Sequence, residues 1–194
     1  MEDDGGVMKI LISYAIPAER VRIEFFGCQV RYCETGIGKV NAALAVCEAV
    51  RDAQLDLVLN VGTAGSVTHA VGSIVACGRF IDRDMMQLKE FGVPYQHDFV
   101  DALARMPLLR GLDVAHVCNT GDTFVTQVIE QADVVDMENF AVAEVCRRAG
   151  IPLVSVKYIT DRIGENSVQH WEEKLHEANI GLQAFFDGWS ANWE

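Results

Sequence analysis

Short apolar runs alternate with stretches of helical spacing along most of the chain. Residues 8–13 (MKILIS) and 29–35 are rich in apolar and β-branched side chains and predict buried strands, whereas 41–53 is alanine-rich with apolar residues at helical spacing. Such alternation is typical of an α/β domain with a largely parallel sheet. Further strands are predicted over 57–61, 73–80, 114–119 and 153–160, and further helices over 138–149 and 168–189, the first of which follows residues 134–136.

The length of the chain favours one domain, and its negative charge disfavours binding to nucleic acid or to a membrane. The chain has 194 residues, which suits a single domain over 8–194 after a flexible extension, 1–7. Lys and Arg number 16 against 28 Asp and Glu, a net charge of −12, so we expect no binding to nucleic acid or to an anionic membrane. No apolar run approaches the roughly 18–20 residues of a membrane span, and the acidic N-terminus is unlike a secretory signal, which predicts a cytoplasmic protein.

Cysteine and histidine show no metal-binding pattern. The six cysteines are scattered without a C-x-x-C pair, which favours buried thiols over disulfides in a chain of this size. The five histidines show no H-x-x-x-H or H-E-x-x-H spacing. We therefore predict neither a metal site nor a cofactor.

Polar residues follow several predicted strands. Ligands of parallel α/β sheets lie beyond the carboxyl ends of the strands. Three carboxylates occupy such positions, namely Glu19, Glu138 and Asp161, together with the glycine-flanked segments 36–39 and 62–65. Polar groups that converge on one rim predict a site for a small polar molecule.

Each of these features also has a purely structural interpretation. Segments 36–39 and 62–65 could be tight turns, and carboxylates such as Glu138 are favoured at helix N-termini without any ligand. Asp161 could cap a helix, and the aromatic residues Phe124 and Trp171 could belong to the core. Their combination favours a functional site.

These segments resemble, in this order, the purine nucleoside phosphorylase/nucleosidase superfamily, and within it the bacterial 5′-methylthioadenosine/S-adenosylhomocysteine nucleosidases. The resemblance implies a three-layer α/β/α sandwich around a mixed, mainly parallel, curled sheet. It also implies hydrolysis of the N-glycosidic bond of an adenine nucleoside, with adenine released, as in methionine salvage. The matching segments are MKILISYAIPAERV (8–21), ETGIGKVNAA (34–43), NVGTAG (60–65), VGSIV (71–75), NTGDTFV (119–125), VDMENFAVAEVC (135–146) and IPLVSVKYITD (151–161).

The resemblance assigns a role to individual positions. Asp161 stands at the position of the general acid that protonates purine N7, and Glu19 at that of the carboxylate that activates water. Glu138 matches the acceptor of the ribose hydroxyls. The remaining positions implied to contact the nucleoside are Thr63, Ala64, Gly65, Phe124, Val125, Met137 and Trp171, of which Phe124 would stack on the purine and Trp171 would cover the 5′ substituent.

Hydrolysis is favoured over phosphorolysis. Asn60 occupies the position where hexameric phosphorylases carry a phosphate-binding arginine, and the Glu19 carboxylate would repel phosphate. Two alternatives remain open among enzymes: a hydrolase of another purine nucleoside, such as futalosine, and a purine nucleoside phosphorylase. A non-catalytic nucleoside-binding protein is a third alternative, although such a protein would be expected to lack Glu19 or Asp161.

The chain departs from the family pattern at several positions. Thr63 replaces a serine, Lys157 replaces an arginine that supports the water-activating glutamate, and Ile16 replaces a methionine at the 5′ pocket. The segment after residues 82–86 is shorter than usual, which leaves the 5′ substituent open. The family is dimeric, so a homodimer is expected, with Met85, Met86 and Leu88 either at the 5′ pocket wall and the dimer contact or in the core.

Overall fold

The computed structural model describes residues 7–51, 53–125, 127, 131–164 and 167–190. Its centre is an eight-stranded sheet in the order β2-β1-β3-β7-β6-β4-β5, with β8 paired to both β3 and β4. The strands are β1 (Met8–Tyr14), β2 (Cys28–Glu34), β3 (Leu57–Ser66), β4 (Ile74–Asp82), β5 (Gln96–Asp98), β6 (His116–Thr120), β7 (Val134–Asp136) and β8 (Leu153–Arg162).

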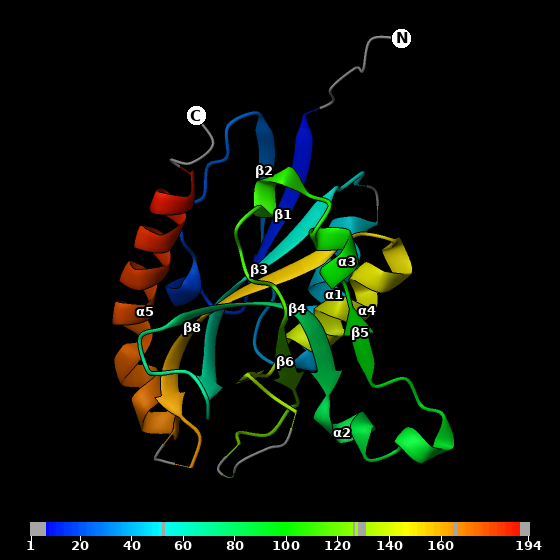
Figure 1. Cartoon of the computed structure of the whole chain (residues 1–194), viewed down its shortest axis with the longest axis vertical. Coiled ribbons are helices and arrows are strands. Elements are labelled where there is room, and N and C mark those ends of the chain that lie inside the picture. The colour runs from blue at the N-terminus through cyan, green and yellow to red at the C-terminus, as the bar shows by residue number, and fades with distance from the viewer. Residues whose placement is uncertain (1–6, 52, 126, 128–130, 165–166, 191–194) are drawn as a thin grey trace.

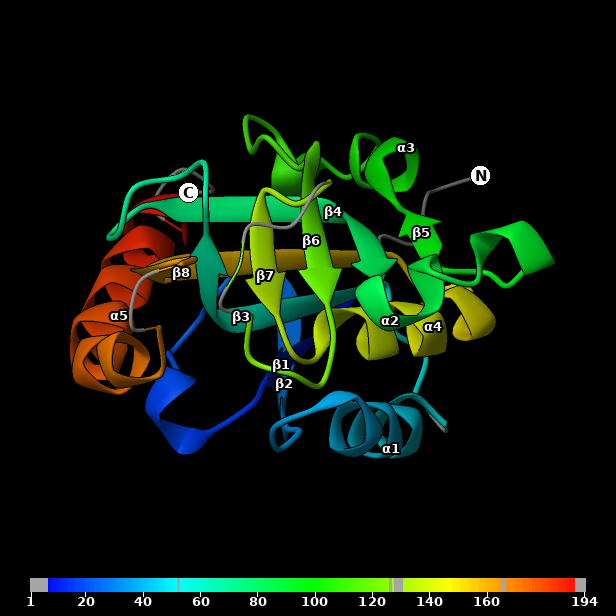
Figure 2. The same cartoon turned by 90° about the horizontal axis from the view of Figure 1, so that it is seen from below.

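Helices cover both faces of this sheet (Figure 1). Helices α1 and α4 lie together on one face and the long α5 lies on the other, as the view from below also shows (Figure 2). The helices are α1 (Lys39–Val50), α2 (Arg83–Met86), α3 (Val100–Leu103), α4 (Asn139–Ala149) and α5 (Ser167–Ser190), with 3-10 turns η1 (Pro17–Glu19), η2 (Lys89–Phe91) and η3 (Pro107–Leu109).

The alternation of side chains along the strands creates two cores. Ile10 and Ile12 of β1 pack with α5, whereas Leu11 between them packs with α1 and α4. Successive side chains of a strand point to opposite faces, so a strand covered on both sides is apolar at nearly every position. This explains the continuous apolar runs of β1 and β3.

The sheet curls until it closes on itself. Strand β3 pairs with β8, β8 with β4, β4 with β6, β6 with β7, and β7 returns to β3 through the pair Gly65 and Val135. Among the described pairings five are parallel and three antiparallel. The predicted three-layer sandwich with a mixed, mainly parallel, curled sheet is therefore confirmed.

Several predicted boundaries were wrong. Segment 62–65 and Asp161 lie inside β3 and β8, not in turns beyond them, because both strands continue through the site. The short strand β5 and helix α2 were missed. Residues 1–6 of the expected extension lie outside the described residues, and Val7 is exposed. Met85 and Leu88 are exposed, so they are not core residues.

Candidate active site

A cavity of about 320 Å³ opens where β3, β7 and β8 meet the segments after β1 and β6. The side chains around it come from segments far apart in the sequence. Every predicted site residue except Lys157 lines it. The lining residues are Ala15, Ile16, Glu19, Ile37, Thr63, Ala64, Gly65, Arg83, Thr123, Phe124, Val125, Val135, Asp136, Met137, Glu138, Asp161, Ile163 and Trp171.

The first carboxylate, Glu19, is held at the end of the η1 turn. Pro17 fits the start of this turn because its fixed φ suits a helical N-terminus. The side-chain amide of Asn179 in α5 donates to the carbonyls of Ala18, at 3.0 Å, and Arg20, at 2.9 Å, on either side of Glu19. The backbone that carries the carboxylate is therefore fixed from both sides.

The Glu19 carboxylate reaches across to β3. Its Oε1 accepts the Thr63 backbone N–H at 2.8 Å and the Thr63 hydroxyl at 2.6 Å, while Oε2 accepts the Ala15 N–H at 3.2 Å. A Cβ at Gly62 would lie 3.1 Å from Glu19 Oε1, so glycine allows this close approach. Buried in the cavity wall, Glu19 keeps acceptor capacity at Oε2 for a ligand or a water.

Asp161 enters the cavity through an irregularity in β8. The register of β3 and β8 shifts between Ala64 and Gly65, so that Gly65 pairs with Asp161 and Thr160 is skipped. Such a bulge re-aims side chains at functional sites. The Thr160 hydroxyl donates to Asp161 Oδ1 at 2.8 Å, and a Cβ at Gly65 would lie 2.8 Å from Asp161 Oδ2. Gly65 is therefore needed for the position of this buried carboxyl group.

Glu138 immediately precedes α4 and accepts the Gly38 backbone N–H at Oε1, at 2.9 Å. Gly38 has φ +91°, a conformation that favours glycine and turns its N–H toward the cavity wall. Burial, and then the nearby Asp136 charge, raise the pKa of Glu138 to about 7. This carboxyl group can therefore change its charge near neutral pH.

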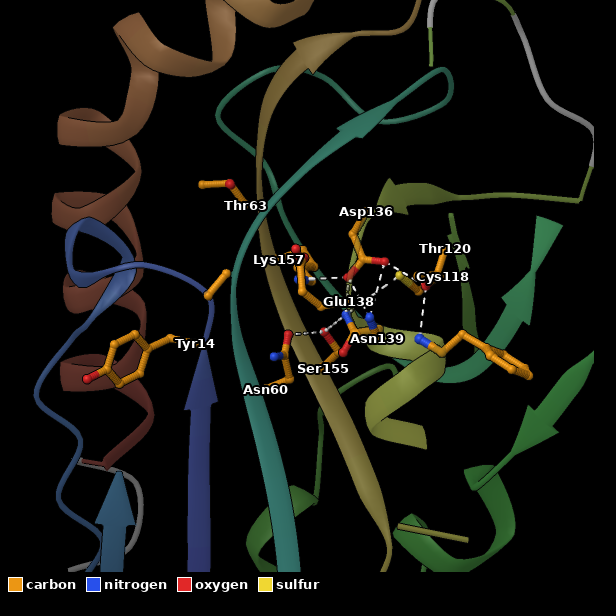
Figure 3. A network of polar contacts seen from close by, with 12 residues as sticks. Tyr14, Asn60, Thr63, Cys118, Thr120, Asp136, Glu138, Asn139, Ser155 and Lys157 are labelled. Atoms are coloured by element: carbon orange, nitrogen blue, oxygen red, sulfur yellow. Dashed lines mark hydrogen bonds and ion pairs between the residues drawn. The ribbon is translucent and has the colours of Figure 1, made fainter. Parts of the chain in front are cut away.

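Lys157 is not among the residues that line the cavity. It belongs to a network of buried polar side chains (Figure 3). Its ammonium group pairs with Asp136 Oδ2 at 3.1 Å, and both side chains are buried. Asp136 also accepts the Thr120 hydroxyl at 2.6 Å and the Asn139 side-chain amide at 2.7 Å. The cation thus compensates the charge of Asp136 beneath Glu138.

Asn60 belongs to the same buried network and not to the cavity lining (Figure 3). Its side-chain amide donates to Ser13, and its carbonyl accepts the Ser155 hydroxyl at 3.2 Å. The Asn139 side-chain amide in turn donates to Ser155 at 2.9 Å. Asn60 therefore links β1, β3 and β8 in the interior and offers nothing to a phosphate.

Sequence reasoning missed Arg83. Its buried guanidinium group donates to the carbonyls of Asn119 at 3.0 Å, Gly121 at 2.8 Å and Thr123 at 2.6 Å, with a longer bond to Asp136. These carbonyls belong to the segment that leads to Phe124, which is 40% exposed at the cavity. The fork geometry of arginine suits this task, but a lone arginine in the sequence gives no sign of it.

Trp171 lies near the start of α5 and lines the cavity. Its indole N–H donates to Thr63 Oγ1 at 2.9 Å. The C-terminal helix therefore contacts the Glu19 region twice, through Asn179 at the backbone and through Trp171 at Thr63.

Comparison with known proteins identifies the fold family. A family model described as "Phosphorylase superfamily" matches residues 17–186. The chain belongs to the phosphorylase superfamily. Relatives in this superfamily include the 5′-methylthioadenosine/S-adenosylhomocysteine nucleosidase of Marinomonas sp., 30% identical over 79% of this chain and 77% of the relative. The nucleosidase of the same name from Colwellia psychrerythraea is 27% identical over 93% and 88%.

Solved structures of superfamily members have the same fold as this chain. The Colwellia psychrerythraea nucleosidase in complex with adenine superimposes with a TM-score of 0.75 and 26% identity, over 94% of this chain and 95% of that chain. The futalosine hydrolase of Helicobacter pylori has the same fold, with a TM-score of 0.76 and 20% identity over 96% and 98%. The expected resemblance to the nucleosidases is confirmed, as is the expectation that the chain is an enzyme.

Within the described ranges, no three side chains of His, Cys, Asp or Glu gather so as to hold a metal ion. No helix in the part of the chain that the structure describes is both long enough and apolar enough to cross a membrane.

Proposed function

We propose that the protein is a nucleosidase that hydrolyses the N-glycosidic bond of 5′-methylthioadenosine and S-adenosylhomocysteine and releases adenine. The observation that carries this proposal is the placement of Glu19 and Asp161 on one cavity, each held by a hydrogen bond from a neighbouring threonine. The names of the relatives support the substrate class.

The chemistry assigns each carboxyl group a task. Water attacks C1′ as the bond from C1′ to purine N9 breaks, and the bonding electrons leave with the purine. Glu19 accepts a proton from the water, and Asp161 gives a proton to purine N7, so that adenine departs neutral. Between these steps the sugar carries oxocarbenium character, which the surrounding carboxylates stabilise. Ionised Glu138 accepts hydrogen bonds from the ribose hydroxyls, while Phe124 stacks on the purine.

The charges around the cavity favour water over phosphate as the attacking group. Four carboxyl groups line it, and among the described lining residues Arg83 carries the cationic side chain. Its guanidinium group is already bonded to backbone carbonyls. A phosphate dianion would therefore meet mainly carboxyl groups, and like charges in a partly dry site are costly.

The proposed 5′ end of the site is apolar. Ile16 and Trp171 line the part of the cavity that the family resemblance assigns to the 5′ substituent. A thioether is weakly polar and suits such walls, whereas a substituent that ends in a carboxylate, as in S-adenosylhomocysteine and futalosine, needs a polar or charged partner at its end. Methylthioadenosine is therefore the preferred substrate, and its consumption would belong to methionine salvage in the cytoplasm.

We also propose that the enzyme acts as a homodimer. Val40 and Leu44, one helical turn apart on α1, are 70% and 63% exposed, and Phe91 after α2 is 82% exposed. The Lys39 ammonium lies 2.6 Å from Asp84, so the start of α1 lies against α2 and these apolar residues can share one face. Light scattering of the wild type and of Leu44→Asp tests this: a dimer that becomes a monomer supports it, and a monomeric wild type contradicts it.

The decisive experiment for the activity measures base release from 5′-methylthioadenosine, S-adenosylhomocysteine, adenosine, inosine and futalosine, each with and without phosphate. Adenine released from the first two without phosphate is the expected result. Release that requires phosphate would identify a phosphorylase, and hypoxanthine from futalosine alone would identify the other hydrolase. No release from any of the five would overturn the proposal.

A further inference from the structure

Trp171, Thr63 and Glu19 form a chain of two hydrogen bonds. The indole Nε1 of Trp171 lies 2.9 Å from Thr63 Oγ1, and Thr63 Oγ1 lies 2.6 Å from Glu19 Oε1. An indole N–H can only donate, and an ionised carboxylate can only accept. Because the threonine hydroxyl has a single proton, one order remains: Trp171 donates to Thr63, and Thr63 donates to Glu19.

We infer that Trp171 is a positioning residue for the water-activating carboxylate and acts on it through the Thr63 hydroxyl, in addition to covering the substrate. This inference rests on the proposed function, in which Glu19 activates the water. Phenylalanine would cover a substrate as well as tryptophan does, but it has no N–H to donate. The identity of the aromatic residue therefore matters for the reaction.

The geometry at Glu19 shows what this chain of bonds achieves. Oε1 accepts two donors from Thr63, whereas Oε2 accepts the longer bond from the Ala15 N–H. With Oε1 occupied, Oε2 has the greater capacity to accept a proton from water. The Trp171 bond also polarises the Thr63 hydroxyl and strengthens its bond to the carboxylate, because hydrogen bonds in series are cooperative.

Helix α5 couples the two roles of Trp171. Asn179 lies eight residues further along the same helix, about two turns, and holds the carbonyls on either side of Glu19. The helix that brings the indole ring to the cavity therefore also fixes the backbone of the base. A shift of α5 would change both the cover over the substrate and the orientation of Glu19.

Kinetics of single and double variants test the inference. Trp171→Phe should lower kcat about three- to tenfold with KM changed less than about twofold, since the lost bond acts on the reaction and not on substrate cover. In a Thr63→Val background the same substitution should have no further effect, and in a Thr63→Ser background it should have its full effect. Trp189→Phe, the same change in the same helix but within the apolar core, is the matched control and should leave kcat unchanged.

Two kinetic outcomes would overturn the inference: a rise in KM alone, or an equal loss from Trp171→Phe with and without the Thr63 hydroxyl. A measurement that needs no turnover runs beside the kinetics. The Trp171 indole N–H resonance, assigned by its absence from Trp171→Phe, should shift and exchange faster with solvent in Thr63→Val; an unchanged resonance also overturns the inference. A wild type that releases no base would refute the proposed function instead, and this resonance would still decide whether Trp171 holds Thr63.

Discussion

Lys157 Nζ lies 3.1 Å from Asp136 Oδ2, and the two side chains are 3% and 1% exposed. Burial by itself would raise the pKa of Asp136, but the Lys157 ammonium and the hydrogen bond from Thr120 outweigh it and lower the pKa. Asp136 is therefore a buried anion whose charge the Lys157 cation compensates, two residues before the ribose-binding candidate Glu138. The electrostatics of the cavity floor depend on this ion pair.

The first prediction concerns this pair. Lys157→Met should lower the free energy of unfolding by about 3–5 kcal/mol, because it leaves a buried carboxylate without its cation. Chemical denaturation measures the loss. Lys174→Met is the matched control, since Lys174 pairs with Glu177 at 2.6 Å on the surface, and it should change stability little. Equal effects of the two substitutions would contradict the role of the buried pair.

Glu138 should make nucleoside binding dependent on pH. Its pKa is raised to about 7, and the ribose hydroxyls need the ionised form as acceptor, so KM should rise as pH falls from 8 to 6. In Glu138→Gln the KM should be higher throughout and nearly independent of pH. A wild-type KM that stays constant over this range would refute the assignment.

Glu138 should also make the stability of the fold depend on pH. Stability should fall as pH rises, whereas nucleoside binding should improve. A carboxyl group whose pKa is raised on folding stabilises the folded state at low pH, and this contribution is lost as pH rises from its unfolded value through about 7. Denaturation of the wild type and of Glu138→Gln at pH 5 and pH 8 should therefore show a larger loss for the wild type between these values.

Removal of either carboxyl group that we propose to be catalytic should abolish most turnover. Asp161→Asn cannot protonate the purine, and Glu19→Gln cannot accept the water proton, so each should lower kcat by about 10²–10⁴. Binding of adenine and the Tm measure whether the cavity remains intact. Near-normal hydrolysis by Glu19→Gln would refute water activation by Glu19, and substantial activity of Asp161→Asn would refute the acid assignment.

Gly65 should be intolerant of even a methyl group. A Cβ there would lie 2.8 Å from Asp161 Oδ2, so Gly65→Ala must displace the carboxyl group and should lower kcat at least about tenfold. Gly188→Ala in α5 is the control, because a Cβ at that position meets no atom of the described residues within 4 Å. Its activity should equal that of the wild type. Full activity of Gly65→Ala would show that Asp161 need not occupy this position.

Arg83 should act on binding through the segment that it holds. Arg83→Lys keeps the charge but cannot reach the carbonyls of Asn119, Gly121 and Thr123 together, so we expect KM to rise and Tm to fall. Arg79→Lys on the neighbouring strand is a surface control, where the ion pair with Asp98 is exposed. If both variants behaved alike, the anchoring of this segment would not require the guanidinium fork.

The sequence pattern is sufficient to predict the layers of the fold, because the strands are covered on both faces and appear as continuous apolar runs. It places the ends of β3 and β8 too early, since Gly62 and Gly65 suggest a turn and Asp161 suggests a helix cap. In the structure the glycines instead make room for Glu19 and Asp161. A close approach between strands and a register shift are tertiary features, which no local pattern shows.

The contacts within the site are likewise tertiary features. Motif resemblance predicts which residues line the cavity, but not which hydrogen bonds and ion pairs hold them in place. Asn60 was noticed as the residue in place of an arginine, yet its contacts with Ser13 and Ser155 place it in the interior. Lys157 stands in place of an arginine that supports the water-activating glutamate in the family, and its role was left open; its observed partner is Asp136. The pairing of buried Lys157 with Asp136 depends on how β8, β3 and β7 are arranged in the sheet.

The bonds from Asn179 to the carbonyls beside Glu19 join positions as far as 161 residues apart. A ribosome makes the chain from its N-terminus, so the turn that carries Glu19 emerges long before the helix that holds it. These two bonds cannot form until α5 has left the exit tunnel. A nascent chain that ends before α5 therefore lacks the contacts that fix the backbone on either side of Glu19.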